Sequence, residues 1–149
     1  FGVEMYYEFY ENLKLLNSLS LKKYCKKIIV NIHPSHKNLV DDLKKIFPKL
    51  LITSQKIDKL IDQSFLLISF SSSAIEDAIS SNRFVILFDQ WKRYLHFKGK
   101  IFDNFNSIFY VNTKSQLKKV IKKIYFEKEE LKNHKISNNL KDNFKKILN

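Results

Sequence analysis

Short β-type runs alternate with segments of helical periodicity along most of the chain, and this alternation narrows the folds open to it. The runs are rich in Ile, Leu, Val and Phe, while the segments between them repeat apolar residues every three or four positions. Strands that alternate with helices predict a parallel sheet with helices on both faces, joined by right-handed crossovers. The predicted strands are 28–32, 50–53, 65–70, 84–88 and 107–111.

These elements predict an α/β fold: one half of a doubly wound arrangement, a Rossmann-like parallel sheet of about five strands with helices on both faces. The first strand, a continuous β-branched run, is expected to be buried on both faces. Ser54 and Thr113 precede helical segments and are suited to capping them. The polar and aromatic segment 89–106 is predicted to be a long loop. The predicted division is a single domain over 1–149, with 1–27 as N-terminal helix and lead-in and 127–149 as a C-terminal helical tail.

The formal net charge of +12 is large, with 27 Lys and Arg against 15 Asp and Glu. Such a charge attracts nucleic acid, an anionic membrane face or anionic substrates. AT-rich coding bias also explains it, because Phe, Ile, Lys, Asn and Tyr are abundant while Gly and Pro are scarce. We favour the bias, since Arg83 and Arg93 are the only arginines and proteins that read bases favour arginine. No specific nucleic-acid partner is therefore expected.

The expected location is cytoplasmic, with peripheral association with an anionic inner membrane. Cys25 is the only cysteine, so no internal disulfide can form and a reducing compartment is favoured. No apolar run approaches the roughly 18 residues that cross a bilayer. Nothing at the N-terminus reads as a signal peptide. The chain begins at Phe1 rather than Met, which is consistent with a piece of a longer protein.

Polar residues stop two of the buried strands and form the first candidate site. His33, Pro34 and Ser35 follow the first strand, and Ser71, Ser72 and Ser73 follow the third and open directly into a helical pattern. In an open parallel sheet, ligands bind beyond the carboxyl ends of the strands. A helix start carries unpaired N–H groups and a partial positive charge, which suits phosphate.

Each candidate residue also has a purely structural interpretation. Serine is a preferred helix cap, and a histidine at a strand end often bonds a loop carbonyl. Three serines in a row, with His33 on the same edge of the sheet, favour a ligand role instead. Glu76 is suited to a ribose diol or simply to the helix dipole. Further candidates, for a base or sugar or as ordinary loop residues, are Asp89, Gln90 and Trp91, with Lys37, Lys92 and Arg93 as electrostatic helpers.

The sequence lacks the motifs that mark several common kinds of active site. There is no glycine-rich phosphate loop, no nucleophile elbow and no pair of carboxylates that stands out as an acid–base couple. His36 could join His33 at a metal, but no cysteine or carboxylate lies at ligand spacing. No metal site and no cofactor are therefore expected.

The order of strand, His33-Pro34, helix, short strand, helix, strand, Ser72-Ser73-Ala74-x-Glu76, helix, strand resembles the C-terminal, donor-binding domain of GT-B glycosyltransferases. The resemblance covers roughly residues 28–125. It is closest to bacterial enzymes of surface polysaccharide assembly: sialyltransferases, capsule Kdo transferases and CDP-glycerol glycerophosphotransferases. The His-Pro and Ser-Ser motifs match residue for residue. Because Ser71 precedes Ser72 and Ser73, the alignment of the serine pair is uncertain by one position.

The resemblance implies a nucleotide-sugar donor, with CMP or CDP as its carrier, and a glycan acceptor of capsule or lipopolysaccharide synthesis. His33, Ser72 and Ser73 would hold the donor phosphate, with His33 stabilising it as it leaves, and Glu76 would hold the ribose. The catalytic base remains unassigned, because in the sialyltransferases it is an acidic residue of the N-terminal one of two Rossmann-like domains. The donor is a substrate, so the resemblance implies no cofactor.

Two alternatives stay open at this point. UDP-GlcNAc 2-epimerases share this half-fold, although serines stand here in place of their usual Gly-rich segment after the third strand. A basic binding module for nucleic acid or an anionic membrane is the other alternative, motivated by the charge of +12.

Overall fold

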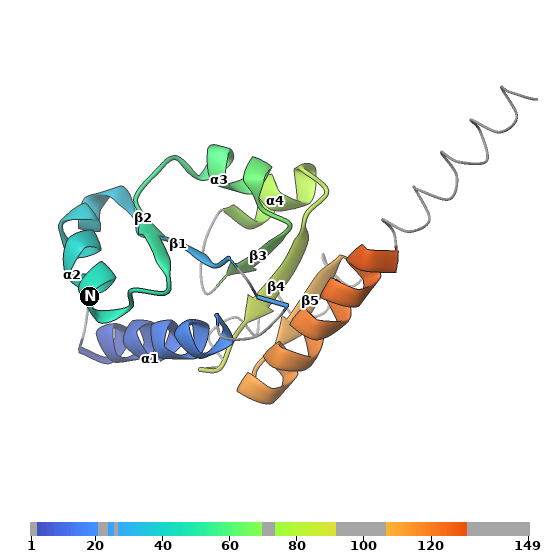
Figure 1. Cartoon of the computed structure of the whole chain (residues 1–149), viewed down its shortest axis with the longest axis horizontal. Coiled ribbons are helices and arrows are strands. Elements are labelled where there is room, and N and C mark those ends of the chain that lie inside the picture. Colours follow the sequence, from blue (N-terminus) through green and yellow to red (C-terminus); the bar gives the residue numbers. More distant parts are fainter. Residues whose placement is uncertain (1–2, 21–23, 26, 70–73, 92–106, 131–149) are drawn as a thin grey trace, which may run out of the picture.

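Short parallel strands and surrounding helices make up the computed structural model, which describes residues 3–20, 24–25, 27–69, 74–91 and 107–130 (Figure 1). The chain is α/β, and each of the five predicted strands is present to within one residue at either end. The elements are α1 (Val3–Leu19), β1 (Ile29–Asn31), the 3₁₀ helix η1 (Pro34–Leu39), α2 (Val40–Ile46), β2 (Leu51–Thr53), α3 (Ile57–Gln63), β3 (Leu66–Ser69), α4 (Ala74–Ser80), β4 (Phe84–Phe88) and β5 (Ile108–Val111), followed by a helix over 114–130, orange in Figure 1.

The strands form two hydrogen-bonded sheets where a sheet of about five strands was predicted. β1 pairs in parallel with β2, placing Val30 opposite Ile52. β3, β4 and β5 form a second parallel sheet in that order. β1 and β2 are three residues long, so each offers few backbone groups for a further ladder. Packing, rather than a continuous ladder, joins the two sheets among the described residues.

One hydrophobic cluster spans both sheets. Val30 and Ile52 of the first sheet share it with Ile86, Phe88 and Val111 of the second. Helix α1 and the 114–130 helix cover this cluster. Their buried contribution consists of Leu13, Leu15, Leu16 and Leu19 from α1 and Leu117, Ile121 and Ile124 from the later helix.

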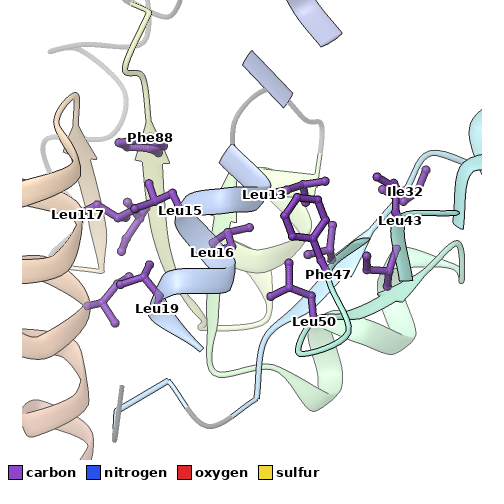
Figure 2. Close-up of a cluster of buried hydrophobic side chains, with 14 of the residues drawn as sticks. Leu13, Leu15, Leu16, Leu19, Ile32, Leu43, Phe47, Leu50, Phe88 and Leu117 are labelled. Atoms are coloured by element: carbon purple, nitrogen blue, oxygen red, sulfur yellow. The ribbon is translucent and has the colours of Figure 1, made fainter. Parts of the chain in front are cut away.

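Helix α1 divides its leucines between the two parts of this core. Figure 2 shows Leu15 beside Phe88 and Leu117, whereas Leu13 and Leu16 face Phe47 and Leu50, which lie between α2 and β2. The side chains of Leu13 and Leu19 are at most 1% exposed, so α1 is a structural element of the domain rather than a surface appendage. The position of α1 agrees with the helix predicted within residues 1–27.

A second cluster lies on the opposite face of β4. Val85 and Leu87 pack there against Ile61 of α3 and Ala78 of α4. Because successive residues of a strand point to opposite faces, the unbroken apolar sequence of β4 is buried on both sides. The expectation of helices on both faces is therefore met at the three-stranded sheet.

The first strand was expected to be buried on both faces, and this prediction was wrong. Val30 is buried in β1, but Ile29 and Asn31 on the other face are only half-buried, and Leu51 in the neighbouring β2 is 51% exposed. Helix α3 places Ile61 in the second cluster and contacts α4, so it leaves the outer face of β1 and β2 partly open. A groove of about 560 Å³ remains there, lined by Lys27, Ile29, Lys44, Pro48, Leu50, Leu51, Ile52, Thr53, Gln55, Leu60 and Gln63.

The two predicted helix caps had different outcomes. Thr113 is confirmed, because its hydroxyl oxygen accepts from the backbone N–H of Gln116 at 3.1 Å. Ser54 is wrong: α3 begins after Lys56, which makes no side-chain capping bond. Most of the predicted loop 89–106 and most of the tail 127–149 lie outside the described residues. None of the described helices is both long and apolar enough to cross a membrane.

Candidate functional site

The polar residues that follow β1 form a tight turn at its carboxyl end. His33 is exposed and stands immediately before η1, with φ −55° and ψ 137°. Pro34 occupies the first position of this 3₁₀ helix, where its missing N–H costs nothing. The backbone N–H of His36 donates to the carbonyl of His33 at 2.8 Å and closes the turn. His33 is therefore held at the strand end with its ring accessible to solvent.

Two imidazoles and one hydroxyl are hydrogen-bonded to one another in this turn. Nδ1 of His33 lies 2.7 Å from Oγ of Ser35, and Oγ lies 3.0 Å from Nδ1 of His36. The backbone N–H of Ser35 also donates to Nδ1 of His33 at 3.3 Å. Such a bond satisfies one of the N–H groups that a helix start leaves unpaired. The capping role uses Nδ1 of His33, and no described residue is bonded to its Nε2.

A buried carboxylate lies at the carboxyl end of β4. Asp89 is 2% exposed, and its Oδ2 accepts a hydrogen bond from the hydroxyl of Tyr110 at 2.6 Å. Burial, together with the hydrogen bond and the negative charge of Asp89, raises the pKa of Tyr110 to about 12. The phenol therefore stays protonated and remains a hydrogen-bond donor at neutral pH.

Ser69, the last residue of β3, is buried, and its hydroxyl has no partner among the described residues. In the parallel register Ser69 lies opposite Leu87, which lies opposite Tyr110, so all three point to the face that α4 covers. Asp89 follows Leu87 by two residues and shares this face. The carboxyl ends of β3, β4 and β5 thus bring a hydroxyl, a carboxylate and a phenol to one side of the sheet.

Two further buried oxygens at strand ends also lack a partner in the described part of the chain. They are Oδ1 of Asn31, the last residue of β1, and Oε1 of Gln90, which follows Asp89. The large majority of buried side-chain polar atoms in proteins have a hydrogen-bond partner, so each exception calls for an explanation. A ligand or water at this edge of the domain would supply the missing donors.

The predicted serine cluster, Ser71, Ser72 and Ser73, lies outside the described residues, as do Lys92 and Arg93. Helix α4 begins at Ala74 and carries Glu76, exposed, in its first turn. Asp77 stands beside it, so both carboxylates fit the helix dipole as well as a ligand. Trp91 is 39% exposed, and its ring contacts the exposed ring of Tyr7 in α1 edge-on, with centroids 6.1 Å apart.

The predicted site residues that the structure describes follow strands of two different sheets. His33 and Pro34 lie at the end of β1 in the two-stranded sheet, while Asp89 and Gln90 lie at the end of β4 in the other sheet. His33 and His36 are both hydrogen-bonded to Ser35, and no group of three or more metal-binding side chains occurs in the described segments.

Sequence reasoning assigned no role to Ser69, Tyr110 or Asn31, and it noted Ser35 only as one of the polar residues that follow the first strand. Ser69 and Asn31 each carried a signal, because each is a polar residue within an otherwise apolar strand. Tyr110 carried none, since a tyrosine in a strand is ordinary. In a comparison with known proteins, no family model, no curated protein and no solved structure matches the chain.

Proposed function

We propose that this chain is the nucleotide-sugar-binding half of a GT-B-type glycosyltransferase that builds a bacterial surface glycan. Its two parallel sheets correspond to the two sides of one Rossmann-like sheet, with β1 and β3 as the strands beside the ligand. His33 and the serines Ser71 to Ser73 bind the donor phosphate, and Glu76 binds the ribose. A cytidine nucleotide, CMP or CDP, is the donor's leaving group.

The observation that carries this proposal is the state of His33. Its Nδ1 is occupied by the N–H of Ser35, so the ring proton belongs on Nε2, and His33 is exposed at a strand end. An N–H donor at that position suits a phosphate oxygen. The unpartnered oxygen of Ser69, one residue before the end of the predicted third strand, adds a polar group near the serine segment.

In the proposed reaction the domain binds the donor and stabilises its phosphate as the glycosidic bond breaks. A fixed hydrogen-bond donor aimed at developing negative charge lowers the barrier because it needs no reorganisation during the reaction. This half does not activate the acceptor hydroxyl. That task belongs to an acidic residue of a preceding domain.

Calorimetric titration of the chain with CMP and with cytidine tests the proposal. We expect CMP to bind and cytidine, which lacks the phosphate, to bind much more weakly. A hydrogen bond to a charged group contributes about 1.5–3 kcal/mol, so His33→Ala should weaken CMP binding roughly tenfold or more. Ser72→Ala should also weaken it.

Asn38→Ala, an exposed change in the same turn, is the matched control and should leave CMP affinity unchanged. Equal heats for CMP and cytidine, or a His33→Ala variant that binds CMP like the unaltered chain, would contradict the proposal. Loss of binding only on reversing the exposed charges Lys118 and Lys122 would favour the basic binding module instead. Epimerisation of UDP-GlcNAc without any acceptor would favour the epimerase.

A further inference from the structure

The hydrogen bonds around Ser35 assign a tautomer to the ring of His33. A backbone N–H can only donate, and that of Ser35 points at Nδ1 of His33 at 3.3 Å. Nδ1 therefore carries a lone pair, and the proton of the neutral ring is on Nε2. The opposite tautomer would leave this N–H without an acceptor at the start of η1.

The direction of the remaining two hydrogen bonds follows from this assignment. Oγ of Ser35 lies 2.7 Å from the same Nδ1, and two lone pairs would repel at that distance, so the hydroxyl donates its proton to His33. Oγ then has only lone pairs to offer to Nδ1 of His36, 3.0 Å away. His36 must donate to it and therefore carries its proton on Nδ1, the tautomer that free histidine disfavours.

We propose that Ser35 is a positioning residue that fixes the tautomers of both imidazoles and directs Nε2–H of His33 outward as a phosphate donor. The inference rests on the proposed function for the identity of its ligand, but its geometry rests only on the turn itself. With Nε2–H of His33 directed outward, the site should select a ligand group that can only accept a hydrogen bond, such as a phosphate oxygen. A ligand hydrogen-bond donor at the same place would face the N–H proton.

The test is a long-range proton–nitrogen NMR correlation of the histidine rings at neutral pH, made on the whole chain. We expect His33 as Nε2–H and His36 as Nδ1–H. Ser35→Ala should return His36 to Nε2–H, and Ser35→Thr, which keeps the hydroxyl, should preserve the pattern. Ser35 is exposed, so both variants should keep the circular dichroism of the unaltered chain, and Asn38→Ala serves as control.

CMP titration of the same variants gives the second readout. If loss of Ser35 leaves the His33 ring correctly oriented for only a third to a half of the time, CMP affinity falls about two- to threefold. Ser35→Thr should restore it. His36 as Nε2–H in the unaltered chain, or unchanged CMP affinity in Ser35→Ala, would overturn the inference. The expected tautomers without any CMP binding would support the assignment and overturn the proposed function alone.

Discussion

At the scale of single residues, one hydrogen bond at the carboxyl edge joins Tyr110 to the buried carboxylate of Asp89. Tyr110→Phe removes the donor to a carboxylate that is only 2% exposed, and should lower the free energy of unfolding by about 1–3 kcal/mol. Urea unfolding measures this loss. Tyr125→Phe, which removes no hydrogen bond to a described residue, should change stability much less. Equal effects of the two changes would mean that the Tyr110 bond does not form.

The pKa of the same phenol gives a prediction in alkaline solution. The folded-state pKa of Tyr110 is raised from 10.0 to about 12, so the folded chain keeps a proton that the unfolded chain loses between these values. This contribution to stability is complete below pH 10 and declines as pH rises toward 12. In a tyrosinate absorbance titration, Tyr110 should ionise late among the seven tyrosines. If Tyr110→Phe leaves the most alkaline part of the titration curve unchanged, late ionisation of Tyr110 is contradicted.

Removing the hydroxyl of Ser69 should not lower the free energy of unfolding, in contrast to removing that of Tyr110. The Ser69 hydroxyl is buried without a described partner, so Ser69→Ala should leave stability unchanged or raise it by up to about 1–3 kcal/mol. Ser64→Ala removes a hydroxyl that donates to the carbonyl of Leu60 and should lower stability. Urea midpoints compare the two. If Ser69→Ala destabilises as much as Ser64→Ala, the hydroxyl of Ser69 is bonded and the polar edge is already satisfied.

At the scale of elements, the 114–130 helix depends on its buried face rather than on its charged one. Leu117 is fully buried against α1 and Phe88, whereas Lys118 beside it is exposed (Figure 2). Leu117→Ala should cost about 2–5 kcal/mol of unfolding free energy, and Lys118→Ala little. Chemical unfolding of both variants checks this. Similar costs would mean that the helix does not pack as described.

Prediction from the sequence was correct for elements that their own short stretch of residues determines. Each predicted strand was found because a short run of mainly apolar residues, rich in β-branched and aromatic side chains, between helical segments is typical of a buried strand. The prediction that β1 is buried on both faces was wrong because such burial depends on where α3 packs. Ile61 of α3 packs with α4 rather than over β1. The Ser54 cap failed for a related reason, since α3 begins two residues later than the capping pattern indicates.

The candidate site was predictable in part. A histidine directly after a strand marks the carboxyl edge, and His33 lies there. Its hydrogen bonds with Ser35 and His36 depend on the 3₁₀ turn that begins at Pro34, and this turn was not predicted from the sequence. Tyr110 and Asp89 are 21 positions apart, and only the parallel register of β4 and β5 brings them together.

At the scale of the whole molecule, one core joins two sheets that share no described ladder. Because α1 packs on both parts and the cluster is continuous, we expect a single cooperative unfolding transition. The fluorescence of Trp91, the single tryptophan, reports on the end of β4, and far-ultraviolet circular dichroism reports on all elements. Their urea midpoints should coincide. Separate midpoints would show that the sheets unfold as independent units.

The most direct test of the account follows the ring nitrogens of His33 by NMR while CMP or cytidine is added. The account predicts that CMP shifts the Nε2 signal of His33 and that cytidine, at the same concentration, does not. The Nδ1 signal should move less, because Ser35 already occupies it. A CMP titration that leaves Nε2 of His33 unmoved, or that cytidine reproduces in full, would contradict a phosphate site at this strand end.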